Sequence, residues 1–564
     1  MAGPLGRFSS SPRVYSRLAE DLYGHGIRTV FGLMSDDTAV LITELEGRGV
    51  RFVSARHENN AIVMGEGFAS KSDGLGVCVI GRGPAAANCV NAIIHASRTQ
   101  TALLVIVGDQ PRNNQIFNAP GPDLKWLDAE RLFLAAGLLT MRPSSAEDAQ
   151  VVLRNAMAEA ERGQTVILLL PTDILNAPAA ERVSGDHVMP TQRKSIAARP
   201  AALALAQELL STARRPLIVA GIGAVRADAR EDLLRLAEKT GALLLTSLRA
   251  KDFFAGHRLN LGISGSFAHS VARRLVNQAD CVISFGAALN LLTSSFGEFF
   301  PHVPLIHVDD RRDHIGRYCH ADIALVGDAR LVAEELLALL PEKAAAEKPF
   351  HDADVLKSIA QFDHRRDFEP AHTDWTVDMR SLALRIDQLL PAGRDVVMDL
   401  GNFFAIAPYV SVPSPKHFRY TDHFASIGLG LGTAIGVSVG NADLPTVLFI
   451  GDGSLMMTLG ELESVARENL NLTIFVFNDH AYGAESHFLA LRDRPVGTST
   501  FPAVDFAPIA ENLGIESYKI QSMTELDALG TTLKAVRGPL LVDCKINPSI
   551  TAPFLTEFAR LEGY

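Results

Sequence analysis

Short apolar runs rich in β-branched residues alternate with amphipathic stretches along nearly the whole chain. The first set lies at residues 28–33, 51–55, 76–81, 102–108 and 165–171. Strands that are buried on both faces appear as continuous apolar runs, and parallel strands need a crossover, usually a helix, between them. The alternation therefore predicts an α/β fold whose mostly parallel sheets are covered by helices on both faces.

Two stretches without a strand or helix pattern divide the chain into three units. One is polar and covers about residues 182–200, and the other is charged and covers residues 341–368. A chain of 564 residues also exceeds what one hydrophobic core supports. We therefore predict three consecutive α/β domains joined by linkers, with bounds at 1–182, 200–340 and 371–564.

Composition excludes several classes of protein. The chain is 47% hydrophobic and 21% charged, which excludes a disordered chain. No apolar run approaches the roughly 18 residues of a membrane span. Residues 1–13 lack the apolar core of a signal peptide. The net charge of −11 argues against binding to nucleic acid. The cysteines are scattered without a CxxC pair, so we expect buried, reduced thiols in a cytoplasmic protein: Cys78, Cys89, Cys281, Cys319 and Cys544.

The most informative motif lies where two neighbouring strands are expected to end. The apolar run 445–453 ends in Gly-Asp-Gly, which places Asp452 at the carboxyl edge of the sheet, where open α/β sheets bind ligands. The next run, 472–479, ends in Asn478-Asp479. Adjacent oxygen ligands, glycines that admit a phosphate and the N-terminus of a following helix together suit Mg²⁺ that holds a diphosphate.

With these motifs the chain resembles the thiamine-diphosphate enzymes of the pyruvate decarboxylase and acetohydroxyacid synthase type. The resemblance covers essentially the whole chain and implies a pyrimidine-binding, a central and a diphosphate-binding domain, in that order. It implies thiamine diphosphate and Mg²⁺ as cofactors, with the metal held by Asp452, Asp479 and the backbone carbonyl of Ala481. Because the family usually has Asn at the second position, Asp479 adds a negative charge to this site.

The family also requires a Glu after the second strand of its first domain, and Glu58 in RFVSARHENNA stands there. The resemblance implies that its carboxyl binds N1′ of the aminopyrimidine and favours the tautomer whose 4′ nitrogen deprotonates thiazolium C2. It also implies that Ile427 in FASIGLG is the apolar wedge that bends the cofactor. In this family the Glu and the Gly-Asp-Gly site come from different subunits, so we expect a homodimer or homotetramer with active sites between chains.

Further cofactor contacts follow from the resemblance. DLGNFFA at 399–405 matches the first diphosphate loop of the family, and GRGPAAAN at 81–88 matches its glycine-proline loop. In the second loop Arg82 stands where many synthases have Ser, and Asn88 is the expected polar contact. The implied cofactor contacts are Gly401, Asn402, Phe403, Ser426, Ile427, Gly451, Asp452, Gly453, Ser454, Asp479, Ala481, Tyr482 and Gly483.

Positions that differ between subfamilies bear on the substrate. Asp36 and Glu485 stand where pyruvate decarboxylases carry proton-transferring carboxylates, and crowding in a dry pocket would raise the pKa of at least one of them. The paired histidines of the decarboxylases and the Lys of the synthases are absent from the corresponding segments. Gln110 is a candidate catalytic contact and Gln115 a further polar one, whereas His487 faces either the pocket or the core.

We therefore predict a lyase or carboligase that acts on a 2-oxo acid or related carbonyl compound. It decarboxylates this substrate through a C2-carbanion/enamine intermediate that is protonated or attacks a second carbonyl. The alternatives among enzymes are an acetohydroxyacid (acetolactate) synthase catalytic subunit and a diketone C–C hydrolase on the same fold. A non-catalytic cofactor-binding protein is the alternative outside enzymes, against which Glu58 argues. A nicotinamide oxidoreductase would need a G-x-G-x-x-G after the first strand, and this chain lacks it.

The central domain bears on a second cofactor, because synthases of this family often bind FAD there. Residues 221–227 form only a weak glycine pattern. The Arg that follows the Gly-Ala pair in FAD-binding relatives is missing after Gly286-Ala287. The sequence therefore argues against FAD without excluding it.

Overall fold

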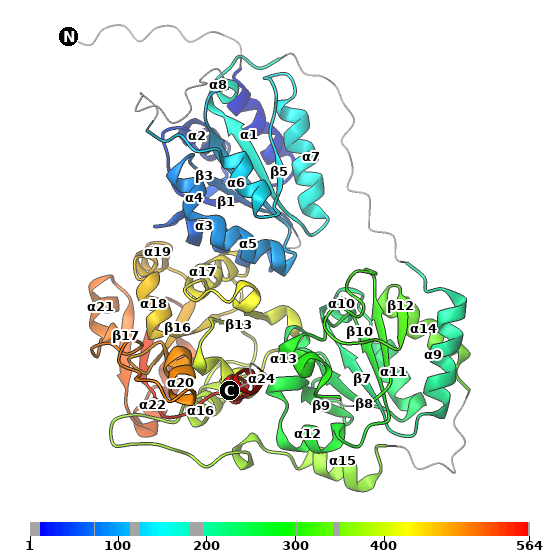
Figure 1. The fold of residues 1–564 in the computed structure, drawn as a ribbon. Coiled ribbons are helices and arrows are strands. Elements are labelled where there is room, and N and C mark those ends of the chain that lie inside the picture. Colours follow the sequence, from blue (N-terminus) through cyan, green and yellow to red (C-terminus); the bar gives the residue numbers. More distant parts are fainter. Residues whose placement is uncertain are drawn as a thin grey trace, which may run out of the picture.

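Three parallel sheets follow one another along the chain, and each belongs to its own α/β domain (Figure 1). The computed structural model describes residues 12–72, 74–112, 124–180, 196–300, 302–341 and 350–561. Each sheet has six strands, and every pairing between named strands is parallel. The predicted fold class is confirmed.

The N-terminal domain contains a sheet of order β2-β1-β3-β4-β6-β5 with helices on both faces. Its strands are β1 (Thr29–Gly32), β2 (Arg51–Ser54), β3 (Gly76–Ile80), β4 (Leu103–Asp109), β5 (Leu139–Met141) and β6 (Thr165–Pro171). Its helices are α1 (Val14–Gly24), α2 (Ala39–Gly47), α3 (Glu58–Ala69), α4 (Pro84–Asn88), α5 (Val90–Thr99), α6 (Ala129–Ala135), α7 (Ala149–Glu161) and α8 (Thr172–Leu175).

The central domain, green in Figure 1, has a sheet of order β12-β11-β10-β7-β8-β9. Its strands are β7 (Pro216–Ala220), β8 (Leu243–Thr246), β9 (Asn260–Ile263), β10 (Cys281–Phe285), β11 (Leu305–Asp309) and β12 (Ile323–Val326). Its helices are α9 (Pro200–Thr212), α10 (Ile222–Arg226), α11 (Arg230–Thr240), η1 (Leu248–Ala250), η2 (Gly265–Phe267), α12 (Ser270–Val276), α13 (Leu291–Ser294), η3 (Ser295–Gly297) and α14 (Ala329–Leu339).

The C-terminal domain has a sheet of order β14-β13-β15-β16-β18-β17, the same order of successive strands as the N-terminal sheet. Its strands are β13 (Asp395–Met398), β14 (Phe418–Tyr420), β15 (Thr446–Gly451), β16 (Leu472–Asn478), β17 (Glu516–Ile520) and β18 (Leu540–Lys545). Its helices are α16 (Met379–Leu389), η5 (Asn402–Tyr409), η6 (Pro415–His417), η7 (Asp422–Phe424), α17 (Gly430–Gly440), α18 (Asp452–Met457), α19 (Glu461–Arg467), α20 (Gly483–Leu491), α21 (Phe506–Asn512), α22 (Met523–Ala528), α23 (Gly530–Ala535) and α24 (Pro553–Leu561).

The stretch predicted as the second linker contains helical structure. It forms α15 (Ala353–Ala360) and η4 (His364–Arg366). Val355, Leu356 and Ile359 lie on one side of α15 and pack against the core of the central domain. Three apolar residues at helical spacing suffice for this contact, although the segment is otherwise charged. Of the first predicted linker, residues 182–195 lie outside the described part of the chain.

The N-terminal and C-terminal domains share one hydrophobic core where α3 packs on α17 (Figure 1). The two helices approach so closely that glycine is required at the contact. A Cβ on Gly67 would collide with the backbone oxygen of Thr433, and one on Gly436 would collide with that of Met64. The two domains are therefore held together by close backbone packing.

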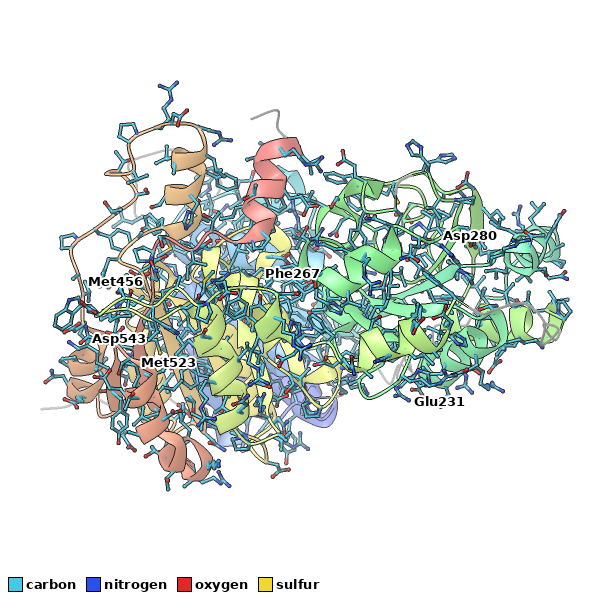
Figure 2. The ribbon with its side chains drawn as sticks, turned by 90° about the horizontal axis from the view of Figure 1, so that it is seen from below. Glu231, Phe267, Asp280, Met456, Met523 and Asp543 are labelled. Carbon is cyan, nitrogen blue, oxygen red and sulfur yellow. The ribbon has the colours of Figure 1, made fainter. Side chains whose placement is uncertain are left out.

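The central domain meets the C-terminal domain through aromatic side chains. Phe267 lies at this junction (Figure 2), and its ring centroid is 5.4 Å from that of Phe404 and 5.8 Å from that of Phe554. Such tilted and edge-on pairs are favourable contacts between aromatic rings. The predicted burial of the cysteines is confirmed for four of the five thiols, all of which are free, whereas Cys319 is partly exposed.

Candidate active site

A pocket opens at the carboxyl edge of the C-terminal sheet, where β13, β15 and β16 end side by side. It is lined by Glu485 and by every cofactor contact predicted in the C-terminal domain except Ser426. Three further lining residues, Leu400, Phe477 and Ala484, were not predicted. Leu400 and Ala484 are next to a predicted residue in the sequence and Phe477 is two positions from Asp479, so the flanks of the motifs were the available signal. Ser426 accepts a hydrogen bond of 2.9 Å from Asn91 Nδ2.

Two carboxylates face each other at the base of this pocket. Asp452 is the first residue of α18, directly after β15, and Asp479 follows the neighbouring strand β16. Burial is the main cause that raises the pKa of both carboxyls. At Asp452, repulsion by the hydrogen-bonded Asp479 raises the pKa further. Among the described residues, neither carboxylate has an ion pair, so a bound cation would relieve this repulsion.

The donor set fits Mg²⁺, which prefers oxygen ligands. Both carboxylates and Ala481 line the same pocket, so the backbone carbonyl of Ala481 is available as the third predicted ligand. In the described ranges of the chain, no group of three or more His, Cys, Asp or Glu side chains is placed to hold a metal ion. This observation is consistent with a site of two carboxylates completed by a backbone oxygen.

The neighbouring asparagine has a different role. Asn478 points into the sheet, where its Nδ2 donates to the Val504 carbonyl at 3.0 Å and to Asp543 Oδ1 at 2.9 Å. Asn402 is also held, because its Nδ2 donates to the carbonyl of Ile550 at 2.7 Å and its Oδ1 accepts from the Ala552 amide at 2.8 Å. These bonds keep the strand end and the η5 loop in place around the pocket.

Glu58 begins helix α3 in the N-terminal domain. The ring of His57 caps this helix by accepting a hydrogen bond from the Asn59 amide, and Asn88 Nδ2 donates to Glu58 Oε2 at 3.1 Å. Asn88, the predicted polar contact in the glycine-proline loop, thus lies beside Glu58. Glu58 is not among the residues that line the pocket of its own chain.

The two predicted proton-transferring carboxylates lie on different domains. The Asp36 side chain is 73% exposed, and a hydrogen bond from Lys125 holds its pKa below the usual value. Its neighbour Asp37 is buried and accepts a 2.8 Å hydrogen bond from the Arg82 amide, a contact that the sequence did not reveal. Glu485 is exposed at the edge of the pocket. Within one chain, the expected crowding of Asp36 against Glu485 does not occur.

The remaining predicted polar contacts are distributed over several places. Gln110 follows β4, and its buried Oε1 has no hydrogen-bond partner among the described residues. Gln115 lies outside the described residues. His487 on α20 is bonded through Nδ1 to Thr551 Oγ1 at 2.9 Å, and burial lowers its pKa. His487 thus holds the segment before α24 and does not line the pocket.

The glycine pattern of the central domain has a packing explanation. A Cβ on Gly221, after β7, would collide with the backbone of Gly286 and Ala287 after β10. The two loops therefore fill each other's space at the point where the strand order changes direction, which is the usual ligand crevice of such sheets. This contact is compatible with the expectation against FAD, which stays a prediction.

Comparison with protein families covers all three domains. The N-terminal TPP binding domain of thiamine pyrophosphate enzymes matches residues 13–127, the central domain matches residues 203–336, and the C-terminal TPP binding domain matches residues 399–544. The chain belongs to the thiamine pyrophosphate enzymes. The pocket at the ends of β15 and β16 lies in the part that matches the C-terminal TPP binding domain of this family.

Curated relatives of this thiamine pyrophosphate enzyme differ in the reaction they are named for. It is 26% identical to a "Probable sulfoacetaldehyde acetyltransferase" of Rhizobium meliloti, over 94% of this chain and 93% of the relative. It is 26% identical to a "Probable acetolactate synthase large subunit" of Methanococcus aeolicus, over 90% and 87%. A "Probable 2-ketoarginine decarboxylase" of Pseudomonas aeruginosa is 28% identical, over 90% and 89%.

A solved structure supports the fold of this thiamine pyrophosphate enzyme. It is titled "X-ray structure of a putative thiamin diphosphate-dependent enzyme isolated from Mycobacterium smegmatis". The TM-score is 0.76 at 21% identity, and the match covers 95% of this chain and all of the other. Within the described ranges, no helix is long and apolar enough to cross a membrane.

Proposed function

We propose that this chain is a thiamine-diphosphate- and Mg²⁺-dependent enzyme that acts on a 2-oxo acid or related carbonyl compound, as a decarboxylase or carboligase. The observation that carries the proposal is one pocket at the ends of β13, β15 and β16, which gathers all but one of the cofactor contacts predicted in the C-terminal domain. Residues from four separate segments meet there, which an incidental likeness of motifs does not explain.

The diphosphate end of the pocket supplies the metal ligands. Asp452, Asp479 and the carbonyl of Ala481 would hold Mg²⁺, while Gly401 and Gly453 leave room for phosphate oxygens near it. A Cβ on Gly453 would collide with the ring of Tyr482, so a larger residue would have to displace this ring. Thiamine diphosphate, when bound, supplies an electron sink beside the substrate carbonyl.

The other end of the site needs an apolar support and a carboxyl. Ile427 lines the pocket and would support the bend between the two rings of the cofactor. Glu58 would hold a proton at N1′ of the aminopyrimidine, and Asn88 would orient its carboxyl. Because Glu58 does not line the pocket of its own chain, we propose that a second copy of the chain supplies it, in a homodimer or homotetramer.

Acid–base groups near the reacting carbon would finish the reaction. Glu485 stands at the edge of the pocket and would deliver a proton to the product. Asp36, ionised and paired with Lys125, would act as a proton acceptor or orient the substrate from the partner chain. Gln110 would contribute its amide, because its buried oxygen has no partner among the described residues.

A synthase that joins two carbonyl compounds is the second candidate function. The similarity to a relative named as an acetolactate synthase large subunit favours it. The alternative of a diketone hydrolase has no support of this kind from the relatives described above. The decarboxylase and synthase candidates need the same cofactor site and differ in the molecule that receives the acyl unit.

The test is proton NMR of the products that purified protein forms from pyruvate with thiamine diphosphate and Mg²⁺. Acetaldehyde supports a decarboxylase, and acetolactate or acetoin supports a carboligase. If pyruvate is not turned over, 2-ketoarginine and sulfoacetaldehyde are tried next, since relatives are named for them. Absence of cofactor binding by calorimetry would overturn the proposal, whichever substrate is used.

A further inference from the structure

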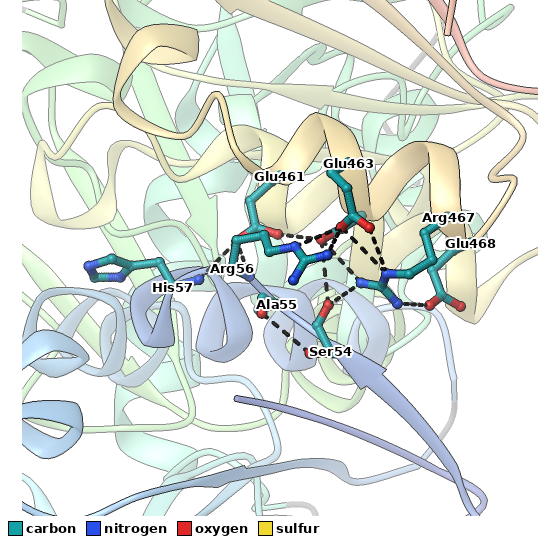
Figure 3. A network of polar contacts seen from close by, with 9 residues as sticks. Ser54, Ala55, Arg56, His57, Glu461, Glu463, Arg467 and Glu468 are labelled. Carbon is teal, nitrogen blue, oxygen red and sulfur yellow. Dashed lines mark hydrogen bonds and ion pairs between the residues drawn. The ribbon is translucent and has the colours of Figure 1, made fainter. Parts of the chain in front are cut away.

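A buried carboxylate of the C-terminal domain binds the backbone directly before Glu58 (Figure 3). Glu461, the first residue of α19, is 0% exposed. Its Oε1 accepts hydrogen bonds from the Arg56 amide at 2.8 Å, the His57 amide at 3.2 Å and Asn60 Nδ2 at 3.0 Å. Its Oε2 accepts from Ser464 Oγ at 2.8 Å.

These contacts fix the start of helix α3. Arg56 and His57 precede Glu58, and Asn60 lies in the first turn. The amides at the start of a helix have no partner within the helix, and the side-chain oxygen of Glu461 supplies an acceptor for the donors there. The direction in which α3 begins, and with it the position of Glu58, therefore depends on a side chain from another domain.

The rest of α19 holds the same strand end. Arg56 Nε donates to Glu463 at 2.7 Å, and Arg467 Nη2 donates to the Ser54 carbonyl at 2.5 Å (Figure 3). These partners are more exposed than Glu461, and exposed ion pairs contribute little to stability. Glu463 thus offers a matched control. It is on the same helix as Glu461 and also contacts Arg56, but it binds the Arg56 side chain and not the backbone amides before Glu58.

We propose that Glu461 is a positioning residue that sets the geometry of Glu58, an inference that rests on the proposed function. Glu461 follows α18, whose first residue is the candidate metal ligand Asp452. The segment that presents the metal ligand to one pocket therefore also positions the carboxyl of Glu58. Displacement of an oriented group by about 1 Å is enough to slow a reaction on the order of 100-fold.

The first test uses the protein without cofactor. Amide hydrogen exchange by mass spectrometry follows a peptide that spans residues 55–60 in wild type, Glu461→Ala, Glu461→Asp, Glu461→Gln and Glu463→Gln. Alanine removes the acceptor oxygen, and aspartate has a shorter side chain that cannot reach the amides. The Arg56 and His57 amides should therefore exchange at least about ten-fold faster in both variants. Glutamine retains an oxygen for the three donors, so Glu461→Gln and Glu463→Gln should exchange like wild type.

The second test follows exchange of the thiazolium C2 proton for deuterium on bound thiamine diphosphate with Mg²⁺. Glu461→Ala and Glu461→Asp should slow this exchange about 10- to 100-fold, whereas Glu461→Gln and Glu463→Gln should stay within about three-fold of wild type. In a Glu58→Gln background, Glu461→Asp should have little further effect, because it acts through Glu58. If Glu461→Ala does not fold, Glu461→Asp carries both tests.

Three results would overturn the inference while leaving the proposed function intact. In the first, Glu461→Asp exchanges the C2 proton at the wild-type rate. In the second, Glu461→Gln exchanges it as slowly as Glu461→Asp. In the third, the double variant of Glu461→Asp and Glu58→Gln is slowed by the product of the two single effects. The proposed function fails in a different way. In that case wild type itself would not accelerate C2 exchange, which would overturn the role of Glu461 as well.

Discussion

Asp452, which is buried, and Asp479, which is half-buried, form a hydrogen-bonded pair of carboxyls at the ends of two neighbouring strands. The asparagine next to this pair, Asn478, points the opposite way and binds Asp543 inside the sheet. Adjacent residues on a strand point to opposite sides, so one of the two polar residues faces the pocket and the other supports the strand. The two positions therefore respond differently to substitution.

Substitutions at Asp452, Asp479 and Asn478 should separate effects on metal binding from effects on stability. Asp452→Ala should abolish Mg²⁺-dependent binding of thiamine diphosphate. Asp479→Asn retains an oxygen ligand, so the affinity for the cofactor should fall less than about ten-fold. Asn478→Ala should bind the cofactor normally but lose about 1–3 kcal/mol of stability, because a buried hydrogen bond is lost. Titration calorimetry and thermal unfolding measure the two effects. Equal cofactor affinities in Asp452→Ala and wild type would contradict the metal assignment.

Glu58→Gln should retain cofactor binding and lose most of the turnover. Glutamine keeps the size of the side chain but cannot hold a proton as a carboxyl does, so the rate should fall on the order of 100-fold or more. Calorimetry with thiamine diphosphate and product NMR check the two parts. Asn59→Ala, a change at the next position, serves as a control for damage to the helix start. Full turnover in Glu58→Gln would favour a protein that binds the cofactor without using this proton relay.

Gly436→Ala should loosen the contact between α3 and α17. Its Cβ would collide with the backbone oxygen of Met64, which cannot move independently of its helix. Overpacking of this kind costs about 1–3 kcal/mol or more, so the Tm should fall by several degrees. Gly47→Ala is the matched control at the end of α2, where a Cβ meets nothing within 4 Å, and its Tm should stay equal or rise slightly.

Asp422 makes stability depend on pH. Burial raises the pKa of this carboxyl to about 7, although Arg249 acts in the opposite direction. The folded protein therefore holds the proton more tightly than the unfolded chain, and this contribution to stability is lost as the pH rises from about 4 through 7. Asp422→Asn mimics the protonated form, so its Tm relative to wild type should rise by about 3 °C or more between pH 5 and pH 8.

Thermal unfolding at several pH values tests this expectation. Asp443 is exposed, so Asp443→Asn is the control and should show a Tm difference from wild type that does not change with pH. A constant Tm difference in Asp422→Asn would show that this carboxyl is ionised in the folded protein throughout the range.

That these residues would meet in one pocket could be predicted, because most of them directly follow strands that are themselves evident as apolar runs. The strands β5 and β9 could not, since β5 has only three residues at a sheet edge and β9 is interrupted by Gly262, which has a positive φ of 75°. The contacts of Glu461 with Arg56 and His57 were also invisible, because they join residues about 400 positions apart. Such contacts depend on how domains pack, which no local pattern records.

The packing of α3 on α17 has a consequence for how the protein is made. About 360 residues separate the end of one helix from the start of the other. At about 5–20 residues per second, a ribosome needs about 20–70 s to supply the second helix after the first. During that time the apolar side of α3 that meets α17, with Val63 and Met64, has no cover from its eventual partner. The newly made N-terminal domain is thus exposed to aggregation until the last third of the chain emerges.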